Sequence, residues 1–249
     1  MNQEEILIRS TLDGTLQPSL FYRAKGSGRP LLVGLHTWSY DRFNQIKKML
    51  PFAEKFDFNL LLPEFRGANL DTNPHSSLAC GSENAKRDIK DAVVYVVKNE
   101  NVDKDNIFLL GASGGGHMAL LMAGYCPEYF KAIGAFVPIT DLKKWTEQNV
   151  NYKKHVLACC SSELEMEKRS PMAYIDTIAK ANLKIFHGKY DNVVPVVQSM
   201  ELYGKLFEKY PKSRVFLDIF DGGHQMSMDV AMSWLLADYE EKTQTEVTG

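Results

Sequence analysis

The chain has 249 residues, enough for one large α/β domain with a sizeable core. Hydrophobic residues make up 45% of it and charged residues 24%, which excludes a long disordered tract. The 29 basic and 31 acidic residues give a formal charge of −2, too small to recruit nucleic acid or an anionic membrane. We therefore expect a single domain, residues 1–249, that acts on a small neutral or mixed substrate.

The N-terminus and the cysteines indicate where such a protein works. Residues 1–9 show neither a basic segment followed by an apolar one nor a cleavage site, so we expect no signal peptide. The apolar runs are far shorter than the roughly 20 residues of a membrane-spanning helix. The cysteines lack the spacing of zinc ligands, and none follows a strand as a nucleophile would. We expect a cytoplasmic protein with reduced thiols and neither metal nor cofactor. The cysteines are Cys80, Cys126, Cys159 and Cys160.

The first part of the chain reads as a hairpin followed by alternating strands and helices. Residues 6–12 and 16–24 alternate like an antiparallel pair joined at Asp13-Gly14, a dipeptide that favours tight turns. In the helix that we expect at 84–99, apolar residues fall on one stripe. The other elements expected here are strands at 30–36 and 59–63 and a helix at 41–56.

The second part continues this alternation around an irregular segment. Residues 106–110 form a wholly apolar run, typical of a central strand covered on both faces. Residues 141–181 are irregular and polar, and we expect them to form a small helical cap over the site. The alternation predicts an α/β fold with a mostly parallel sheet and helices on both faces. The remaining expectations are helices at 114–126, 196–209 and 225–239, strands at 130–137, 183–187 and 215–220, and a frayed tail at 240–249.

The segment Gly-Ala-Ser-Gly-Gly at 111–115 matches the G-x-S-x-G motif, in which a serine sits on a sharp strand-to-helix turn. The glycines remove side chains that would collide there. An apolar strand precedes the motif and a helical segment follows it, which is the context the chemistry requires. A helix N-terminus behind the serine also stabilises negative charge. We identify Ser113 as the candidate nucleophile; the alternative is a glycine-rich turn that binds nothing or cradles phosphate.

A serine nucleophile needs a neutral imidazole to accept its proton. His224 lies in a glycine-rich loop after the last apolar strand and before the terminal helix, so we identify it as the candidate base. His36 and His187 end strands beside apolar sequence, and we interpret both as structural. The other histidines lie in a buried helix or in polar stretches without partners; they are His75, His117 and His155.

The base needs a carboxylate to fix its tautomer, and two aspartates compete for this role. Asp191 sits in a turn directly after a strand and before a helix, whereas Asp141 follows a strand and could equally cap the next helix. We favour Asp191. The resulting order of serine, aspartate and histidine is the one expected for an α/β-hydrolase.

Several segments together resemble the catalytic domain of the prolyl-oligopeptidase-like serine hydrolases. The resemblance spans nearly the whole chain and implies an α/β-hydrolase fold. That group includes peptidases and small carboxylesterases, so the resemblance implies the reaction type more than the substrate. The segments are Leu-His-Thr-Trp at 35–38, Pro-Glu-Phe-Arg-Gly at 63–67, the helix with Asp88 and Asp91, residues 111–115, Ser170-Pro171, His187-Gly188 with Asp191 and Val194-Pro195, and Gly223-His224.

The same resemblance points to an oxyanion hole, which is normally made by two backbone N–H groups. Gly114, directly after the nucleophile, would supply one and Trp38 the other, while the indole of Trp38 either lines the acyl pocket or packs in the core. Two features depart from the family pattern. Thr37 stands where relatives usually have glycine, and the chain has no room for the N-terminal propeller of the oligopeptidases. We expect Arg66 to form a structural ion pair beside the site.

These observations predict a serine hydrolase that cleaves carboxylic esters through an acyl-enzyme and needs neither metal nor cofactor. The expected partner is a small-molecule ester. A small serine peptidase acting on a short peptide is the alternative within the same chemistry. A binding protein on the hydrolase scaffold is a different class; it would keep its affinity for ligand after Ser113→Ala.

Overall fold

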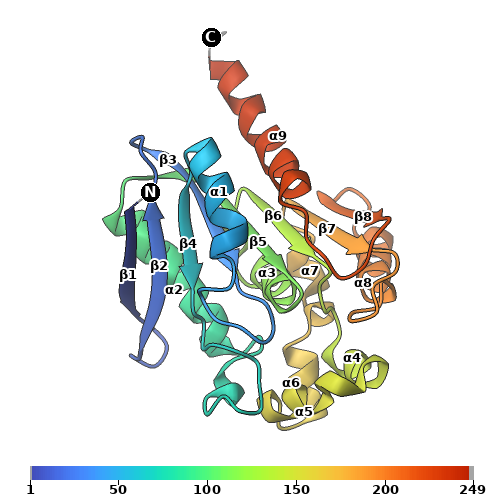
Figure 1. Cartoon of the computed structure of the whole chain (residues 1–249). Helices are drawn as coiled ribbons and strands as arrows, with labels where there is room; N and C mark the ends of the chain where they lie inside the picture. The colour runs from blue at the N-terminus through green and yellow to red at the C-terminus, as the bar shows by residue number, and fades with distance from the viewer. Residues whose placement is uncertain (1, 247–249) are drawn as a thin grey trace.

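The computed structural model describes residues 2–246, of which residues 2, 238 and 240–246 are described by their backbone alone. A sheet of eight strands has the order β1-β2-β4-β3-β5-β6-β7-β8 (Figure 1). The strands are β1 Asn2–Arg9, β2 Leu16–Arg23, β3 Arg29–Leu35, β4 Asn59–Pro63, β5 Val102–Ala112, β6 Ala132–Phe136, β7 Leu183–Gly188 and β8 Val215–Phe220.

The strand directions decide where the site can form. β1 and β2 pair antiparallel, and β2 pairs antiparallel with β4. From β4 to β8 every neighbouring pair is parallel, so these strands all end at the same edge of the sheet. In register, Ala112 lies opposite Phe136, Phe136 opposite Phe186 and Gly188 opposite Phe220. Residues that directly follow these strands therefore gather at one edge, where ligands bind in open α/β sheets.

Helices cover both faces of the sheet. Val33 on β3 packs in one core cluster with Ile89 of α2 and Leu202 of α8, whereas the adjacent Leu32 packs with Met49 of α1 and Leu235 of α9. This alternation follows from the period of two along a strand. The expected α/β architecture, a mostly parallel sheet between helical layers, is confirmed. The α-helices are α1 Ile46–Phe56, α2 Glu83–Asn99, α3 Gly114–Tyr125, α4 Leu142–Gln148, α5 Val150–Cys159, α6 Glu163–Lys168, α7 Ile175–Ile178, α8 Val197–Lys209 and α9 Met228–Glu246, and the 3-10 helices are η1 Ser76–Leu78, η2 Pro127–Tyr129 and η3 Pro171–Tyr174.

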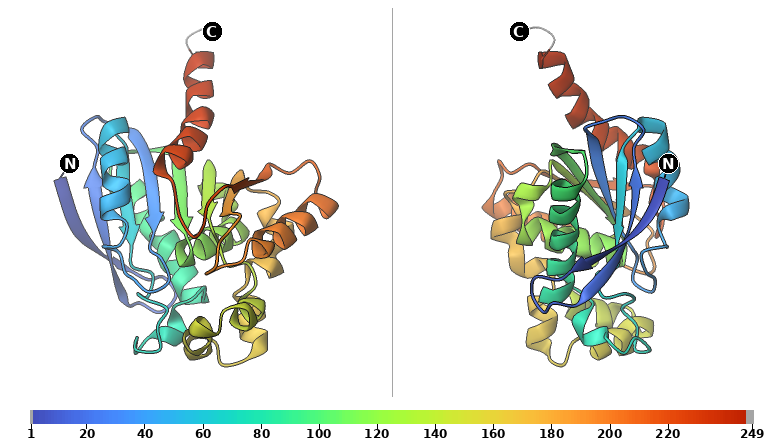
Figure 2. Two further views of the ribbon diagram at one scale, coloured as in Figure 1. Left: turned by 45° about the vertical axis from the view of Figure 1, so that its right-hand side comes forward. Right: turned by 90° about the vertical axis from the view of Figure 1, so that its left-hand side faces the viewer.

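Residues 141–181 form a series of short helices, and Figures 1 and 2 show α4, α5 and α6 gathered beyond the edge where the parallel strands end. Trp145 of α4 is fully buried in a cluster that also contains Trp38, which follows β3. The contact joins these helices to the sheet-edge loop that carries Trp38. α7 belongs to a different layer, because Ile178 packs in the core cluster on the α3 face.

The structure corrects three sequence-based boundaries. The expected antiparallel hairpin is present, with Arg9 opposite Leu16 and the Ser10 N–H donating to the Thr15 carbonyl at 2.8 Å. Its connection therefore spans residues 11–14, and the tight turn expected at Asp13-Gly14 is wrong. The physical reason is that Asp13 accepts the N–H and hydroxyl of Thr15 and forms an ion pair with Arg66. The first helix begins at Ile46 and not at residue 41, since residues 42–45 form turns.

The third correction concerns the C-terminus. The backbone of α9 continues to Glu246, so the expectation of a frayed tail from residue 240 is wrong; its last three residues, 247–249, lie outside the described part of the chain. Residues 228–246 contain neither glycine nor proline, the usual helix-stop signals. Within residues 2–246, no helix combines the length and the apolar character needed to cross a membrane.

Candidate active site

Ser113 occupies the turn between β5 and α3 in a strained backbone conformation. Its φ of 56° and ψ of −120° are rare for a residue with a side chain, and such strain is worth roughly 1–3 kcal/mol. Two backbone hydrogen bonds hold it: its N–H donates to the Phe136 carbonyl at 2.9 Å, and its own carbonyl accepts the His117 N–H at 2.8 Å. The turn thus presents Ser113 at the sheet edge as the motif predicts.

The motif glycines are required by close backbone approach. A Cβ on Gly111 would lie 2.2 Å from the carbonyl oxygen of Gly115, and one on Gly115 would lie 2.5 Å from that of Leu35. Both distances are far below van der Waals contact, so any side chain at either position would push α3 away from the sheet.

His224 and Asp191 meet although they follow different strands, β8 and β7. The Nδ1 atom of His224 lies 2.7 Å from Oδ2 of Asp191. Because an ionised carboxylate only accepts hydrogen bonds, Nδ1 carries the proton and Nε2 remains free to accept one. The second carboxylate oxygen accepts the N–H groups of Val193 and Val194 at 2.8 and 2.9 Å. The structure thus brings together the two residues that the sequence predicted as base and acid.

The charge on Asp191 is maintained in a buried position. Burial raises the pKa of this carboxyl, but hydrogen bonds from His187, His224 and the Val194 N–H lower it by more, and the net pKa lies well below its usual value. Asp191 is therefore ionised at neutral pH, and its negative charge stabilises a protonated His224.

Asp141, the alternative candidate for the acid, has a structural role. It is the N-cap of α4, where its carboxylate accepts the Lys144 N–H at 3.0 Å. The carboxylate that contacts His224 is that of Asp191. The geometry therefore favours Asp191 over Asp141, as the order of elements along the chain suggested.

His187 reaches the same carboxylate, which the sequence did not indicate. It is fully buried; its Nε2 lies 2.8 Å from the Val194 carbonyl and 3.4 Å from Oδ2 of Asp191. Its Nδ1 lies 2.7 Å from the Ser199 hydroxyl. Since a carbonyl only accepts, Nε2 carries the proton and Nδ1 accepts from Ser199. The structural interpretation of His187 was therefore incomplete; its spacing of four residues from Asp191 in one βα turn was the available signal.

His36 has the structural role that we expected. Its ring is 2% exposed and stacks on Phe65 with ring centroids 3.8 Å apart. Its Nε2 lies 2.8 Å from the carbonyl oxygen of Glu64, which connects the end of β3 to the loop after β4.

Ser113 and His224 line one cleft of about 210 Å³ at the sheet edge. Val137, which follows β6, contributes to it with a φ of 42°, a second strained position beside the serine. Sequence reasoning missed most of this lining because it comes from six separate segments. The other lining residues are Thr37, Trp38, Ser39, Tyr40, Lys48, Ala112, Tyr152, Gln225 and Met226.

The two expected oxyanion donors lie side by side. A Cβ on Gly114 would lie 2.5 Å from the backbone nitrogen of Trp38, so only glycine allows this approach. Within the described part of the chain, neither of the two N–H groups is paired with an acceptor. Two unpaired donors next to the serine are suited to bind a developing oxyanion.

The loop that carries Trp38 is held from both sides. The carbonyl of Trp38 accepts the Asn69 N–H at 2.8 Å. Thr37, the departure from the family pattern, donates both its N–H and its hydroxyl to Oδ1 of Asn44 at 3.1 Å. The threonine therefore adds a side-chain anchor that glycine would lack. The indole of Trp38 is 2% exposed and packs on Trp145 at 4.8 Å, which makes it chiefly a buried aromatic.

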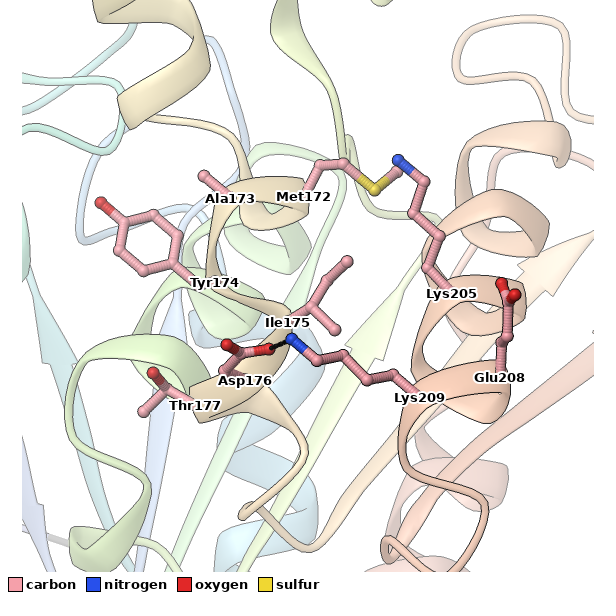
Figure 3. A pocket seen from close by; sticks show the side chains of 9 residues that line it. All are labelled: Met172, Ala173, Tyr174, Ile175, Asp176, Thr177, Lys205, Glu208 and Lys209. Carbon is pink, nitrogen blue, oxygen red and sulfur yellow. Dashed lines mark hydrogen bonds and ion pairs between the residues drawn. The ribbon is translucent and has the colours of Figure 1, made fainter.

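Arg66 and a second hollow are not part of the lining of this cleft. Arg66 forms the expected ion pair, with Asp88 at 2.5 Å and Asp13 at 2.9 Å. A larger hollow of about 810 Å³ lies between the segment 172–177 and α8, and it contains the ion pair between Lys209 and Asp176 (Figure 3). Its lining includes none of the predicted site residues, so its larger volume does not make it the candidate active site. Among the described side chains, those of residues 3–237 and 239, no group of three or more His, Cys, Asp or Glu is arranged to hold a metal ion.

The sheet order and the strand-to-helix serine turn define an α/β-hydrolase fold. The model of the prolyl oligopeptidase family matches residues 79–239. The chain therefore belongs to the prolyl oligopeptidase family of serine hydrolases.

Individual relatives agree with this assignment. The acylamino-acid-releasing enzyme of Homo sapiens is 28% identical over 207 residues, which cover 74% of this chain and 28% of that enzyme. The chain thus spans less than a third of the length of that relative. Among solved structures, an esterase from Pyrococcus furiosus has a TM-score of 0.74 at 19% identity and covers 96% of this chain and 90% of its own. The acylaminoacyl peptidase of Pyrococcus horikoshii has a TM-score of 0.71 at 20% identity, covering 98% of this chain and 41% of its own.

Proposed function

We propose that the protein hydrolyses small carboxylic esters through an acyl-enzyme intermediate. The observation that carries this proposal is the 2.7 Å contact between His224 and Asp191, combined with the position of Ser113 in the same cleft. This arrangement leaves Nε2 of His224 free to accept a proton, as nucleophilic catalysis by serine requires.

In the first half of the reaction, His224 takes the hydroxyl proton of Ser113 while the serine oxygen attacks the ester carbonyl. The carbonyl oxygen gains a negative charge and accepts hydrogen bonds from the N–H groups of Gly114 and Trp38. The tetrahedral intermediate then expels the alcohol, which takes its proton from His224. The acyl group remains on Ser113.

In the second half, His224 takes a proton from water, and the resulting hydroxide attacks the acyl carbonyl. The intermediate breaks down, His224 returns the proton to Ser113, and the carboxylic acid leaves. Asp191 stays ionised throughout and stabilises the imidazolium that forms in each half.

The size of the cleft supports an ester with a small acyl group over a peptide. At about 210 Å³ it lies below the roughly 300–1,000 Å³ of sites that enclose drug-sized ligands. The aromatic side chains of Trp38 and Tyr152 occupy the space on the cap side. A peptide substrate would need space for residues on both sides of the scissile bond.

A small serine peptidase is the second candidate, and the similarity to the human acylamino-acid-releasing enzyme favours it. Incubation with an ester and an amide of the same acyl group, such as 4-nitrophenyl acetate and 4-nitroacetanilide, separates the two. Cleavage of short N-acylated peptides without cleavage of any ester would overturn the esterase proposal.

The nucleophile is tested by labelling with a fluorophosphonate probe and locating the adduct by mass spectrometry. We expect an adduct on Ser113 that is lost in His224→Ala and weakened in Asp191→Asn, while Asp141→Asn labels at the wild-type rate. Absence of an adduct in the wild-type protein would instead support a binding protein on this scaffold.

A further inference from the structure

The charged groups around the proposed catalytic cleft are unevenly distributed. Of the residues that line it, Lys48 is the one lysine or arginine, and none is an aspartate or glutamate. The carboxylate of Asp191 lies behind His224, where its side chain is fully buried and engaged by N–H donors. A substrate in the cleft therefore faces a positive charge that no lining carboxylate balances.

Lys48 stands on a well-anchored part of the fold. It is the third residue of α1, and its N–H donates to the Gln45 carbonyl at 3.1 Å. One turn earlier, Asn44 accepts two hydrogen bonds from Thr37, the residue before the expected oxyanion donor Trp38. The backbone of Lys48 is thus anchored close to the Trp38 loop, and its exposed, flexible side chain lines the cleft.

Among the side chains that the structure describes, those of residues 3–237 and 239, no carboxylate lies at ion-pair distance from the Lys48 ammonium group. An adjoining cleft shares Ser39 and Tyr40 with the catalytic one and does contain carboxylates, but these are engaged elsewhere. Glu64 pairs with Arg42, Asp13 pairs with Arg66, and Asp41 accepts the Phe43 N–H.

The rest of the cleft is mainly apolar or aromatic. Val137, Tyr152 and Met226 line it together with Trp38. A ligand that satisfies both parts combines an apolar or aromatic body with one anionic group. Pairing of such a group with Lys48 is strengthened because the walls of a cleft exclude part of the solvent.

We propose that this cleft selects esters that carry a carboxylate, with Lys48 as the residue that recognises it. The inference rests on the proposed esterase function and names the substrate class of the same site. The carboxylate can belong to the acyl group or to the leaving alcohol, since Lys48 lies in the cleft that both must share.

The test uses two pairs of matched aryl esters that differ in charge and hardly in shape. Phenyl 4-carboxybenzoate and phenyl 4-carbamoylbenzoate place the group on the acyl side, and 4-carboxyphenyl acetate and 4-carbamoylphenyl acetate place it on the leaving side. The measured quantity is the ratio of kcat/KM for the carboxylate ester to kcat/KM for the carboxamide ester within each pair. This ratio does not depend on the fraction of active enzyme in each preparation.

We expect Lys48→Met to lower this ratio about 5-fold for one of the two pairs, and Lys48→Glu to lower it further by reversing the charge. The pair that responds identifies the side of the scissile bond. Raising the salt concentration should lower the ratio in the wild-type protein and leave it nearly constant in Lys48→Met. Lys47→Met is the matched control, because Lys47 is exposed on the same helix and does not line the cleft; its ratios should equal those of the wild type.

Two outcomes would overturn the inference, and they differ in what else they overturn. If both ratios are unchanged in Lys48→Met and Lys48→Glu while Ser113→Ala abolishes hydrolysis of the carboxamide esters, the substrate class is wrong and the esterase proposal stands. If hydrolysis of all four esters is independent of Ser113, the esterase proposal fails and the inference fails with it.

Discussion

Replacing Asp191 by asparagine should trap His224 in the wrong tautomer. One oxygen of Asp191 accepts the Val193 and Val194 N–H groups at 2.8 and 2.9 Å, and the other faces His224 at 2.7 Å. An asparagine keeps its oxygen on the two backbone donors, because the opposite orientation would bury three N–H groups against one another. Its amide nitrogen then points at His224.

The consequence for catalysis follows from hydrogen-bond geometry. Facing an N–H donor, Nδ1 of His224 must accept, so the proton moves to Nε2, the nitrogen that should take the proton of Ser113. The imidazolium also loses its counter-charge. We expect kcat to fall about 10³- to 10⁴-fold, equivalent to about 4–5.5 kcal/mol of transition-state stabilisation, with little change in KM.

The assay is ester hydrolysis by purified Asp191→Asn, with circular dichroism and thermal unfolding to show that the variant is folded. Asp141→Asn is the matched control; it removes a helix N-cap charge and should keep kcat within about 2-fold. A folded Asp191→Asn variant that loses less than about 10-fold in kcat would refute the assignment of Asp191 as the orienting acid.

Three further predictions concern neighbouring residues. His187→Leu removes a donor to Asp191 and should lower kcat about 10-fold at constant KM, whereas His187→Gln, which keeps an N–H donor, should recover part of the loss; equal losses in both variants would contradict a positioning role. Gly114→Ala would place a Cβ 2.5 Å from the Trp38 nitrogen and should lower kcat about 100-fold or more in steady-state assays, and a smaller effect would argue against the oxyanion site. Burial lowers the pKa of His117 to about 4, so its contribution to stability is complete above the unfolded pKa of about 6.5 and is lost as the pH falls towards 4. Denaturant unfolding should show a loss of up to about 3 kcal/mol over this range, and His117→Gln should remove that part of the pH dependence; an unchanged slope would disprove it.

Local patterns in the sequence were sufficient for much of the fold. The apolar run before Ser113 predicted the central strand, and the stripe from Ala85 to Val96 predicted α2, because burial imposes a period of two on strands and 3.6 on helices. Boundaries were less accurate where side chains bind at long range. Asp13 widened the hairpin loop through Arg66, 53 residues away, which no local pattern contains.

The candidate site divides in the same way. Ser113 could be identified from the sequence because its motif is local: strand, strained turn and helix are contiguous. The glycines of the motif indicate that backbone segments approach each other closely at this turn. His224 and Asp191 could be predicted only as residues that follow strands, since their contact depends on β7 and β8 ending at the same edge.

By itself, the sequence determined the elements, their order and the chemical types available at the ends of the strands. Only the tertiary structure decided which of those groups touch. It brought His187 onto Asp191, set the Trp38 backbone against Gly114 and placed Lys48 at a cleft whose described lining residues include no carboxylate. The reason is that parallel strands carry residues from distant parts of the chain to one edge, where distances of a few ångströms depend on register and packing that no short segment encodes.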